Sequence, residues 1–208
     1  MGTVTQISVQ AKNKTRVNLY IDGDFCCGLD ALTVMEYRLK RGMEIDGAAL
    51  AELVMSAERN SALETASKKV ARTLTTEHEL KNHLFNKGYL AAAVEYAVDK
   101  LKEYGYLGDA EYVKAYYNTY SPSRGDKGLQ YELIGKGVDK NLIEDFFSTA
   151  GDDAPRGAAV AEKYMHGKEY TLENKGKLSH FLYSRGFSGE TSACVIAEIF
   201  ARAGSDGE

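Results

Sequence analysis

The sequence predicts a mostly α-helical protein: an elongated array of three tandem three-helix repeats, preceded by a small N-terminal β-meander and one short helix. Three observations predict this fold class. A ten-residue pattern recurs twice at a spacing of 49 residues, apolar and polar residues alternate over the first thirty positions, and helical periodicity replaces that alternation afterwards. We expect an N-terminal extension over 1–45, a linker helix and first repeat over 46–106, a second repeat over 107–155, and a third repeat with a short tail over 156–208.

The first thirty residues contain three short alternating segments, which predict a three-stranded meander over 3–29. The residues expected on the shared faces are Ile7 and Val9, then Val17, Leu19 and Ile21, then Phe25, Cys27 and Leu29. Asp22-Gly23 predicts a two-residue hairpin, because Gly tolerates positive φ, and Asn13-Lys14 predicts an earlier turn. A sheet this small is marginal alone, so it should pack on the helices that follow.

Helical periodicity begins at Asp30, which can cap a short helix that stops at Gly42. The apolar face expected for this helix comprises Leu32, Met35 and Leu39. Asp46 can cap the next helix, which runs toward Arg72 with an expected break near Asn60.

The repeated block reads Leu, three residues, Leu, two residues, a basic residue, Gly and an apolar residue, at 80–89, 129–138 and 178–187. Leucines four apart lie on one helix face, and Gly can adopt the left-handed conformation that ends a helix. The apolar residue after the Gly then packs on the second leucine, so each block predicts one helix with a Schellman stop. Thr76 and Glu79 add a capping box to the first block. With a helix on either side, each block forms a three-helix unit whose neighbours stack, offering a long binding surface rather than a deep pocket.

Composition excludes several classes of protein. The net charge of -4 disfavours a protein that coats nucleic acid by bulk electrostatics, although residues 68–140 are mildly basic and residues 141–208 acidic. No stretch approaches the roughly 20 apolar residues that span a bilayer, and the N-terminus lacks a signal-peptide core. Cys26, Cys27 and Cys194 lack the spacing of a metal or redox site and are expected to be reduced thiols in apolar surroundings. We therefore expect a cytoplasmic protein.

No catalytic constellation is evident. The four histidines are scattered, and His78 and His83 are five residues apart, not the four that place two metal ligands on one helix face. The Gly125–Gly128 segment lacks the Gly-Lys-Ser/Thr ending of a phosphate-binding loop. We expect no enzyme activity, no metal and no cofactor.

Seven basic residues are the candidates for contact with a partner or DNA: Arg72, Lys81, Lys87, Arg124, Lys127, Lys136 and Arg185. Three of them, Lys87, Lys136 and Arg185, lie at helix C-termini, where the helix dipole by itself favours a cation.

Arg124 and Lys127 lie instead near a helix N-terminus, where the dipole disfavours a cation. Their position has no evident stabilising reason, so contact with a partner or a phosphate is a serious alternative to simple solvation. Arg72 and Lys81 flank the capped start of another helix and are weaker candidates of the same kind.

The residues of these blocks resemble those of the RecX regulatory family. The matching segments are Glu79-Leu80 with Leu84 and Lys87-Gly88, Leu101 with Tyr104 to Asp109, and Gly128-Leu129 with Glu132-Leu133 and Lys136-Gly137-Val138. The resemblance covers about residues 60–200, and the strand-rich head is similar to the extended N-terminus of some members. The chain departs from the family at Gly108, where Asn or a similar residue before the Asp is usual, and in its acidic third repeat.

The resemblance implies a partner and a role. Members of this family bind the RecA recombinase, lie along the groove of its filament on single-stranded DNA, and limit filament growth and activity without a cofactor. We therefore expect a monomeric, non-enzymatic regulator of RecA. The alternative is a direct single-stranded DNA-binding module that uses Arg72, Lys81, Arg124, Lys127 and Lys136.

Overall fold

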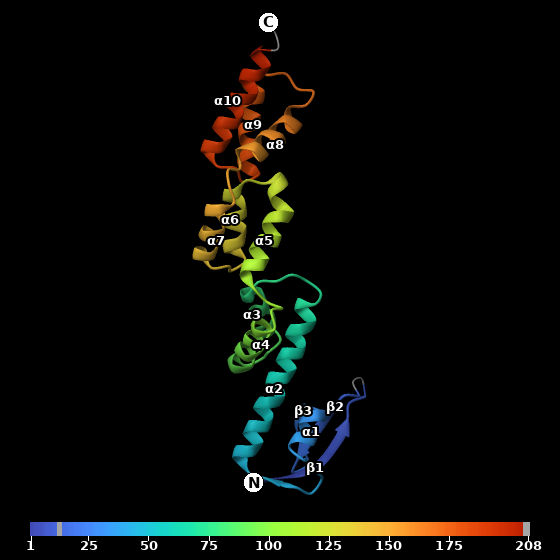
Figure 1. Cartoon of the computed structure of the whole chain (residues 1–208). Coiled ribbons are helices and arrows are strands. Elements are labelled where there is room, and N and C mark those ends of the chain that lie inside the picture. Colours follow the sequence, from blue (N-terminus) through green and yellow to red (C-terminus); the bar gives the residue numbers. More distant parts are fainter. Residues whose placement is uncertain (12–13, 206–208) are drawn as a thin grey trace. The chain divides into compact units, whose positions relative to one another are not determined.

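The computed structural model describes residues 1–11 and 14–205, and the side chains of residues 1–11 and 14–203. The chain divides into two compact units, which are described separately: residues 1–75 with 80–107, and residues 76–79 with 108 onward. Figure 1 labels helices α1 to α10 and strands β1 to β3.

The first unit begins with a four-stranded antiparallel sheet of order β3-β2-β1-β4. Its strands are β1 (Gly2–Val9), β2 (Arg16–Ile21), β3 (Asp24–Asp30) and β4 (Glu44–Ile45). The expected meander is confirmed, and so is the hairpin, since Asp22 and Gly23 both have positive φ. Of the expected earlier turn, Asn13 lies outside the described residues. The short β4 was not predicted, because two residues carry no periodicity.

Two irregularities in the sheet change which side chains face the core. The register shifts between Val4 and Gln6 and between Leu19 and Tyr20. A bulge of this kind inverts the alternation beyond it. Phe25 was expected on the same face as Leu29, which is fully buried, but the Phe25 side chain is 59% exposed.

The two helices that follow the sheet also differ in part from the expectation. The short helix α1 (Ala31–Glu36) ends before Leu39, and it buries Thr33 while Leu32 and Met35 are exposed, so the expected apolar face is wrong. The long helix α2 (Gly47–Val70) begins at the expected cap, where the Asp46 carboxylate accepts a hydrogen bond from the Ala49 amide at 2.8 Å. It continues through Asn60, so the expected break is absent.

The core of the first unit has two parts. Leu53 and Ala57 of α2 pack with Val4, Leu19 and Leu29 of the sheet, which lies beside α2 (Figure 1). The C-terminal half of α2 packs with α3 (Glu77–Phe85) and α4 (Ala91–Glu103). The second part of the core consists mainly of small and branched side chains, which allow α2 and α4 to approach closely.

The second unit contains the helices of the second and third repeats. They are α5 (Asp109–Tyr120), the short 3₁₀ helix η1 (Ser121–Ser123), α6 (Asp126–Gly135), α7 (Lys140–Thr149), α8 (Ala154–Met165), α9 (Leu172–Ser184) and α10 (Gly189–Ser205). Helices α5 to α7 share one buried cluster around Val113 and Leu133, and α8 to α10 share another around Leu178 and Leu182. The mostly helical fold with a small N-terminal sheet is therefore confirmed.

The three helix stops have one backbone conformation. Gly88, Gly137 and Gly186 have φ of +86°, +79° and +84°. After each Gly, the amide of the apolar residue donates to the carbonyl of the second leucine, at 3.3 Å for Tyr89 and 3.2 Å for both Val138 and Phe187. Each Gly amide donates to the carbonyl three residues back at 2.9 Å. This pair of bonds is the Schellman motif that the repeated block predicts.

The cysteines of the chain lie in different surroundings. Burial, with a contribution from neighbouring Cys26, raises the pKa of the Cys27 thiol to about 12, whereas Cys194 is exposed, contrary to the expectation of apolar surroundings. Cys194 lies on an outward face of α10.

Within the described residues, no helix combines the length and the hydropathy that a bilayer crossing requires.

Candidate functional site: the cleft between α6 and α9

In the second unit, the start of one helix binds the stop of a helix in the next repeat. The amides of Gly125 and Gly128, at the start of α6, donate to the carbonyls of Arg185 and Gly186 at 3.0 and 2.9 Å. The equivalent contact 49 residues earlier uses a side chain, because the Thr76 hydroxyl donates to the Lys136 carbonyl at 2.8 Å. The capping box is also confirmed, with the Glu79 amide donating to the Thr76 hydroxyl at 3.1 Å. The repeat thus defines a recurring junction.

Small residues make the contact at Gly186 possible. A Cβ added to Gly125 would lie 2.3 Å from the Cα of Phe187, and one added to Gly128 would lie 2.7 Å from the Cα of Gly186. Both distances are too short for real atoms, so α6 reaches the stop of α9 only because these positions lack a side chain. The two backbones form the floor of a cleft.

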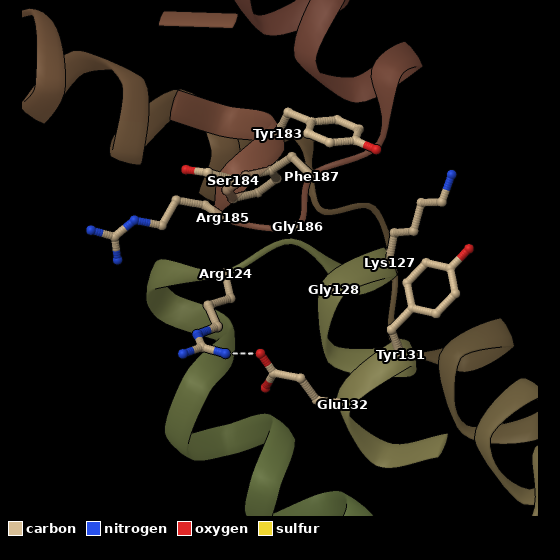
Figure 2. A pocket seen from close by; sticks show the side chains of 10 residues that line it. All are labelled: Arg124, Lys127, Gly128, Tyr131, Glu132, Tyr183, Ser184, Arg185, Gly186 and Phe187. Atoms are coloured by element: carbon tan, nitrogen blue, oxygen red, sulfur yellow. Dashed lines mark hydrogen bonds and ion pairs between the residues drawn. The ribbon is translucent and has the colours of Figure 1, made fainter. Parts of the chain in front are cut away.

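The α6–α9 cleft is open to solvent and has a volume of about 520 Å³. Its lining residues are Arg124, Lys127, Gly128, Tyr131, Glu132, Tyr183, Ser184, Arg185, Gly186 and Phe187. Figure 2 shows Gly186 directly above Gly128, with Lys127 and Tyr131 on one side of the view and Arg185 extending on the other. The cleft brings together three of the seven candidate residues: Arg124, Lys127 and Arg185.

The three cations of the cleft differ in how far they are neutralised. Arg124 forms an ion pair with Glu132 (Figure 2). Its guanidinium also lies over the Tyr120 ring, so Arg124 does have a stabilising reason for its position. Lys127 and Arg185 are exposed and form no ion pair with a described residue, although Arg185 lies over the Phe181 ring. Lys127 and Arg185 therefore supply the uncompensated positive charge of the cleft.

Two tyrosines give the cleft an aromatic component. The Tyr131 and Tyr183 side chains are 65% and 72% exposed. Neither residue was among the predicted contacts, although both positions carry a detectable signal in the sequence. Tyr131 lies between the core residues Leu129 and Leu133, and Tyr183 follows the core residue Leu182, so each ring points away from its helix's buried face.

A polar network beside the cleft holds α8 against the segment that carries Arg124. The Arg156 guanidinium donates to the carbonyls of Ser121 and Arg124 and binds the Asp126 carboxylate at 2.6 Å. Asp153 accepts from the Asp126 amide at 2.9 Å. Burial raises the pKa of Asp126, and the Arg156 guanidinium opposes that rise. This network fixes the backbone that positions the cleft.

The remaining candidates lie elsewhere. Lys136 binds Glu79 at 3.0 Å and lies over the rings of Tyr112 and Tyr116. Its pKa is raised because the Glu79 carboxylate accepts its hydrogen bond, with Tyr112 as the next contributor. Lys136 is therefore largely neutralised.

In the first unit, Lys81 binds Glu95 at 2.8 Å. Arg72 and Lys87 line a second cleft, which is described below. The structure therefore separates the seven candidates into two clusters and two neutralised lysines.

The side chains of the α6–α9 cleft are of types that bind charged and aromatic groups. The Ser184 hydroxyl donates to the Phe181 carbonyl at 2.7 Å, so it is not aligned with a general base. Among the described residues, no group of three or more His, Cys, Asp or Glu side chains is placed to hold a metal ion. Cations, exposed tyrosines and a glycine floor favour recognition of an anionic or aromatic partner surface.

Comparisons with known proteins place the chain among regulatory proteins. The model of the regulatory protein RecX N-terminal domain matches residues 2–46, the segment that forms the sheet and α1. The regulatory protein RecX of Clostridium beijerinckii is 30% identical over 207 residues, covering 97% of both chains. That of Clostridium perfringens strain 13 is 32% identical over 209 residues, covering 96% of this chain and 97% of the relative.

Solved structures agree on the fold. A crystal structure of regulatory protein RecX superposes with a TM-score of 0.69 at 20% identity and covers 94% of this chain and 98% of its own. The crystal structure of RecX from Lactobacillus salivarius gives 0.61 at 23% identity, with 69% and 97% covered. Since the curated relatives match along nearly the whole chain at about 30% identity, the chain belongs to the RecX family of regulatory proteins.

Proposed function

We propose that this protein binds the RecA recombinase filament on single-stranded DNA and limits filament extension, ATP hydrolysis and strand exchange. The observation that carries the proposal is the α6–α9 cleft, whose lining includes two uncompensated cations, Lys127 and Arg185, and two exposed aromatic residues, Tyr131 and Tyr183. Arg and Tyr are the residue types that dominate binding energy at protein interfaces. Membership of the RecX family supports RecA as the target, and the protein acts as a non-enzymatic monomer.

The test is DNA-dependent ATP hydrolysis and strand exchange by RecA in the presence of the protein. The wild-type protein is expected to suppress both at amounts stoichiometric with RecA or lower. The Lys127→Glu/Arg185→Glu variant should need about tenfold more protein for the same effect, because it reverses both uncompensated charges of the cleft.

A matched control is Lys114→Glu/Lys163→Glu. These lysines are also exposed in the second unit, and Lys163, like Arg185, lies in the last turn or cap of its helix. The control should regulate RecA as the wild type does. Unchanged RecA activity with the wild-type protein would refute the proposed function, and an equal reduction of inhibition in the control would refute the role of the cleft.

The alternative function, a direct single-stranded DNA-binding module, is less well supported. Three of its five proposed contacts, Lys81, Arg124 and Lys136, bind carboxylates of this chain. If the alternative holds, affinity for single-stranded DNA alone falls by about 0.7 log units per phosphate contact for each tenfold rise in salt. Absence of binding at low salt eliminates it.

A further inference from the structure

A second cleft in the first unit collects positive charge. It has a volume of about 490 Å³ and lies between the C-terminal ends of α2 and α3. Its lining residues are Thr65, Lys68, Lys69, Arg72, Thr73, His83 and Lys87, and we call it the basic cleft. It contains four Lys or Arg side chains, one histidine and no carboxylate.

Most of this charge is not compensated within the first unit. Lys68 binds Glu64 at 2.5 Å, and that contact, the largest contributor, lowers the pKa of Glu64. Lys69, Arg72 and Lys87, by contrast, form no ion pair with any residue that the structure describes. Burial first, and then the charges of Lys87 and Lys69, lower the pKa of His83. The cleft therefore holds at least three positive charges at close range without an anion.

The helix dipoles explain only part of this cluster. Two helix C-termini meet here, and each favours a nearby cation with an effective charge of roughly -0.5. The equivalent positions of the other repeats show that the scaffold does not need cations here. At the offset of 49 residues, Lys69 corresponds to Asn118 and Gly167, and Arg72 corresponds to Ser121 and Tyr170.

Of the basic residues in the cleft, Lys87 alone has a basic equivalent, Lys136 or Arg185, in both other repeats. The cluster of cations is therefore specific to the first repeat. The equivalent helices of the second and third repeats end without such a cluster.

From this arrangement we propose that the basic cleft is a phosphate-binding site. The ammonium groups of Lys69 and Lys87, the Arg72 guanidinium and the Thr73 hydroxyl are donors suited to phosphate oxygens. A volume of about 490 Å³ accommodates more than one phosphate group. No Phe, Tyr or Trp side chain lines the cleft, and its donors are mainly cationic, so the cleft is suited to the phosphates of a chain more than to a base. The site is independent of RecA and goes beyond the proposed function, and it shares only Arg72 with the contacts of the alternative DNA-binding module.

Consecutive phosphates come either from a nucleic acid backbone or from a free polyphosphate, and two probes separate these sources. The His83 ring resonances and pKa are followed by NMR during titration with oligodeoxythymidylate and, separately, with tripolyphosphate. An anion beside His83 favours the imidazolium, so its pKa should rise on binding. A response to oligodeoxythymidylate at lower concentration identifies the backbone as the source, and the reverse identifies a free polyphosphate. Either response supports the site.

The test variant is Lys69→Gln/Arg72→Gln, which neutralises rather than reverses charge and so spares the end of α2. Affinity for the responding probe should fall by about tenfold or more at low salt. With the oligonucleotide, the slope of log affinity against log salt should become shallower by about 1.4, because two cations that bind phosphate are removed.

The matched control is Lys40→Gln/Arg41→Gln. It changes an exposed Lys and an exposed Arg of the same unit and therefore removes the same net charge. It should bind as the wild type does. The proposal is overturned if neither probe changes the His83 signals, if a hexaglutamate peptide changes them equally, or if the control variant binds as weakly as the test variant. None of these results bears on inhibition of RecA, which is measured separately.

Discussion

The helix stops at Gly88 and Gly186 share one backbone conformation and differ in what covers them. A Cβ added to Gly88 would meet no atom within 4 Å, whereas one added to Gly186 would lie 2.5 Å from the Cα of Gly128. The third stop receives the start of α6, and the first receives no such partner among the described residues. The same local motif therefore serves as a junction in one place and as an open helix end in another.

The difference extends to the charges beside the stops. Lys136 at the second stop is neutralised by Glu79, whereas Lys87 at the first stop contributes to the basic cleft. Arg185 at the third stop lines the α6–α9 cleft. The basic residue before the Gly of each repeat therefore has a different role in each repeat, because a different segment packs against each helix end.

The largest effect is expected for Gly186→Ala. Alanine would carry both the strain of a positive φ and a collision with the backbone of Gly128, which cannot move aside. The free energy of unfolding should fall by about 3 kcal/mol, measured by urea denaturation followed by circular dichroism. A decrease below about 1 kcal/mol would contradict the close junction.

Gly125→Ala separates the two causes. Gly125 has φ of -78°, so alanine adds only the collision with Phe187. We expect the free energy of unfolding to fall by about 2 kcal/mol in the same assay. A neutral result would show that the start of α6 can retreat from the stop of α9.

An intermediate effect is expected for Gly137→Ala. A Cβ added there would lie 2.3 Å from the His78 Cγ and 2.4 Å from the His78 Cβ, so rotation of the ring relieves only part of the collision. The free energy of unfolding should fall by about 2 kcal/mol, of which about 1 kcal/mol comes from positive φ, as at Gly88. In a His78→Gly background the same substitution should cost about 1 kcal/mol less, and an undiminished cost would assign the whole effect to the backbone.

The smallest of the three effects at the helix stops is expected for Gly88→Ala. Its surroundings are open, so only the left-handed conformation is penalised, at about 1 kcal/mol. A decrease in stability as large as that of Gly186→Ala would show that the first stop is covered in solution and would remove the contrast between the two regions.

A still smaller effect concerns pH and His83. Its folded pKa is lowered by burial and by Lys87 and Lys69, so the unfolded chain binds more protons as the pH falls below about 6.5. Stability should therefore decrease from pH 7 to pH 5, and His83→Gln should remove part of that decrease. Urea midpoints at the two pH values provide the measurement, and an identical decrease in the variant would contradict it. The positions equivalent to His83 in the second and third repeats are Glu132 and Phe181. Since neither is a histidine, this pH dependence is confined to the first repeat.

Where sequence reasoning failed, a non-local contact was the cause. Phe25 is exposed because a bulge that depends on pairing with β2 inverts the alternation of β3. Leu32 and Met35 are exposed because α1 packs on the core of the sheet through Thr33 and Val34 instead. The ion pair of Arg124 joins residues eight positions apart across a turn, which residue spacing does not reveal.

The three helix stops, their spacing and the helices around them follow from local sequence alone, because a Schellman motif depends on a few adjacent residues. The capping box at Thr76 and the hairpin at Asp22-Gly23 follow from equally local chemistry. The tertiary structure decided which stop is covered, which cations are neutralised and where two clefts form. Those outcomes depend on contacts between segments that are far apart in the chain. Packing brings these segments together and thereby decides which hydrogen bonds and ion pairs form between them.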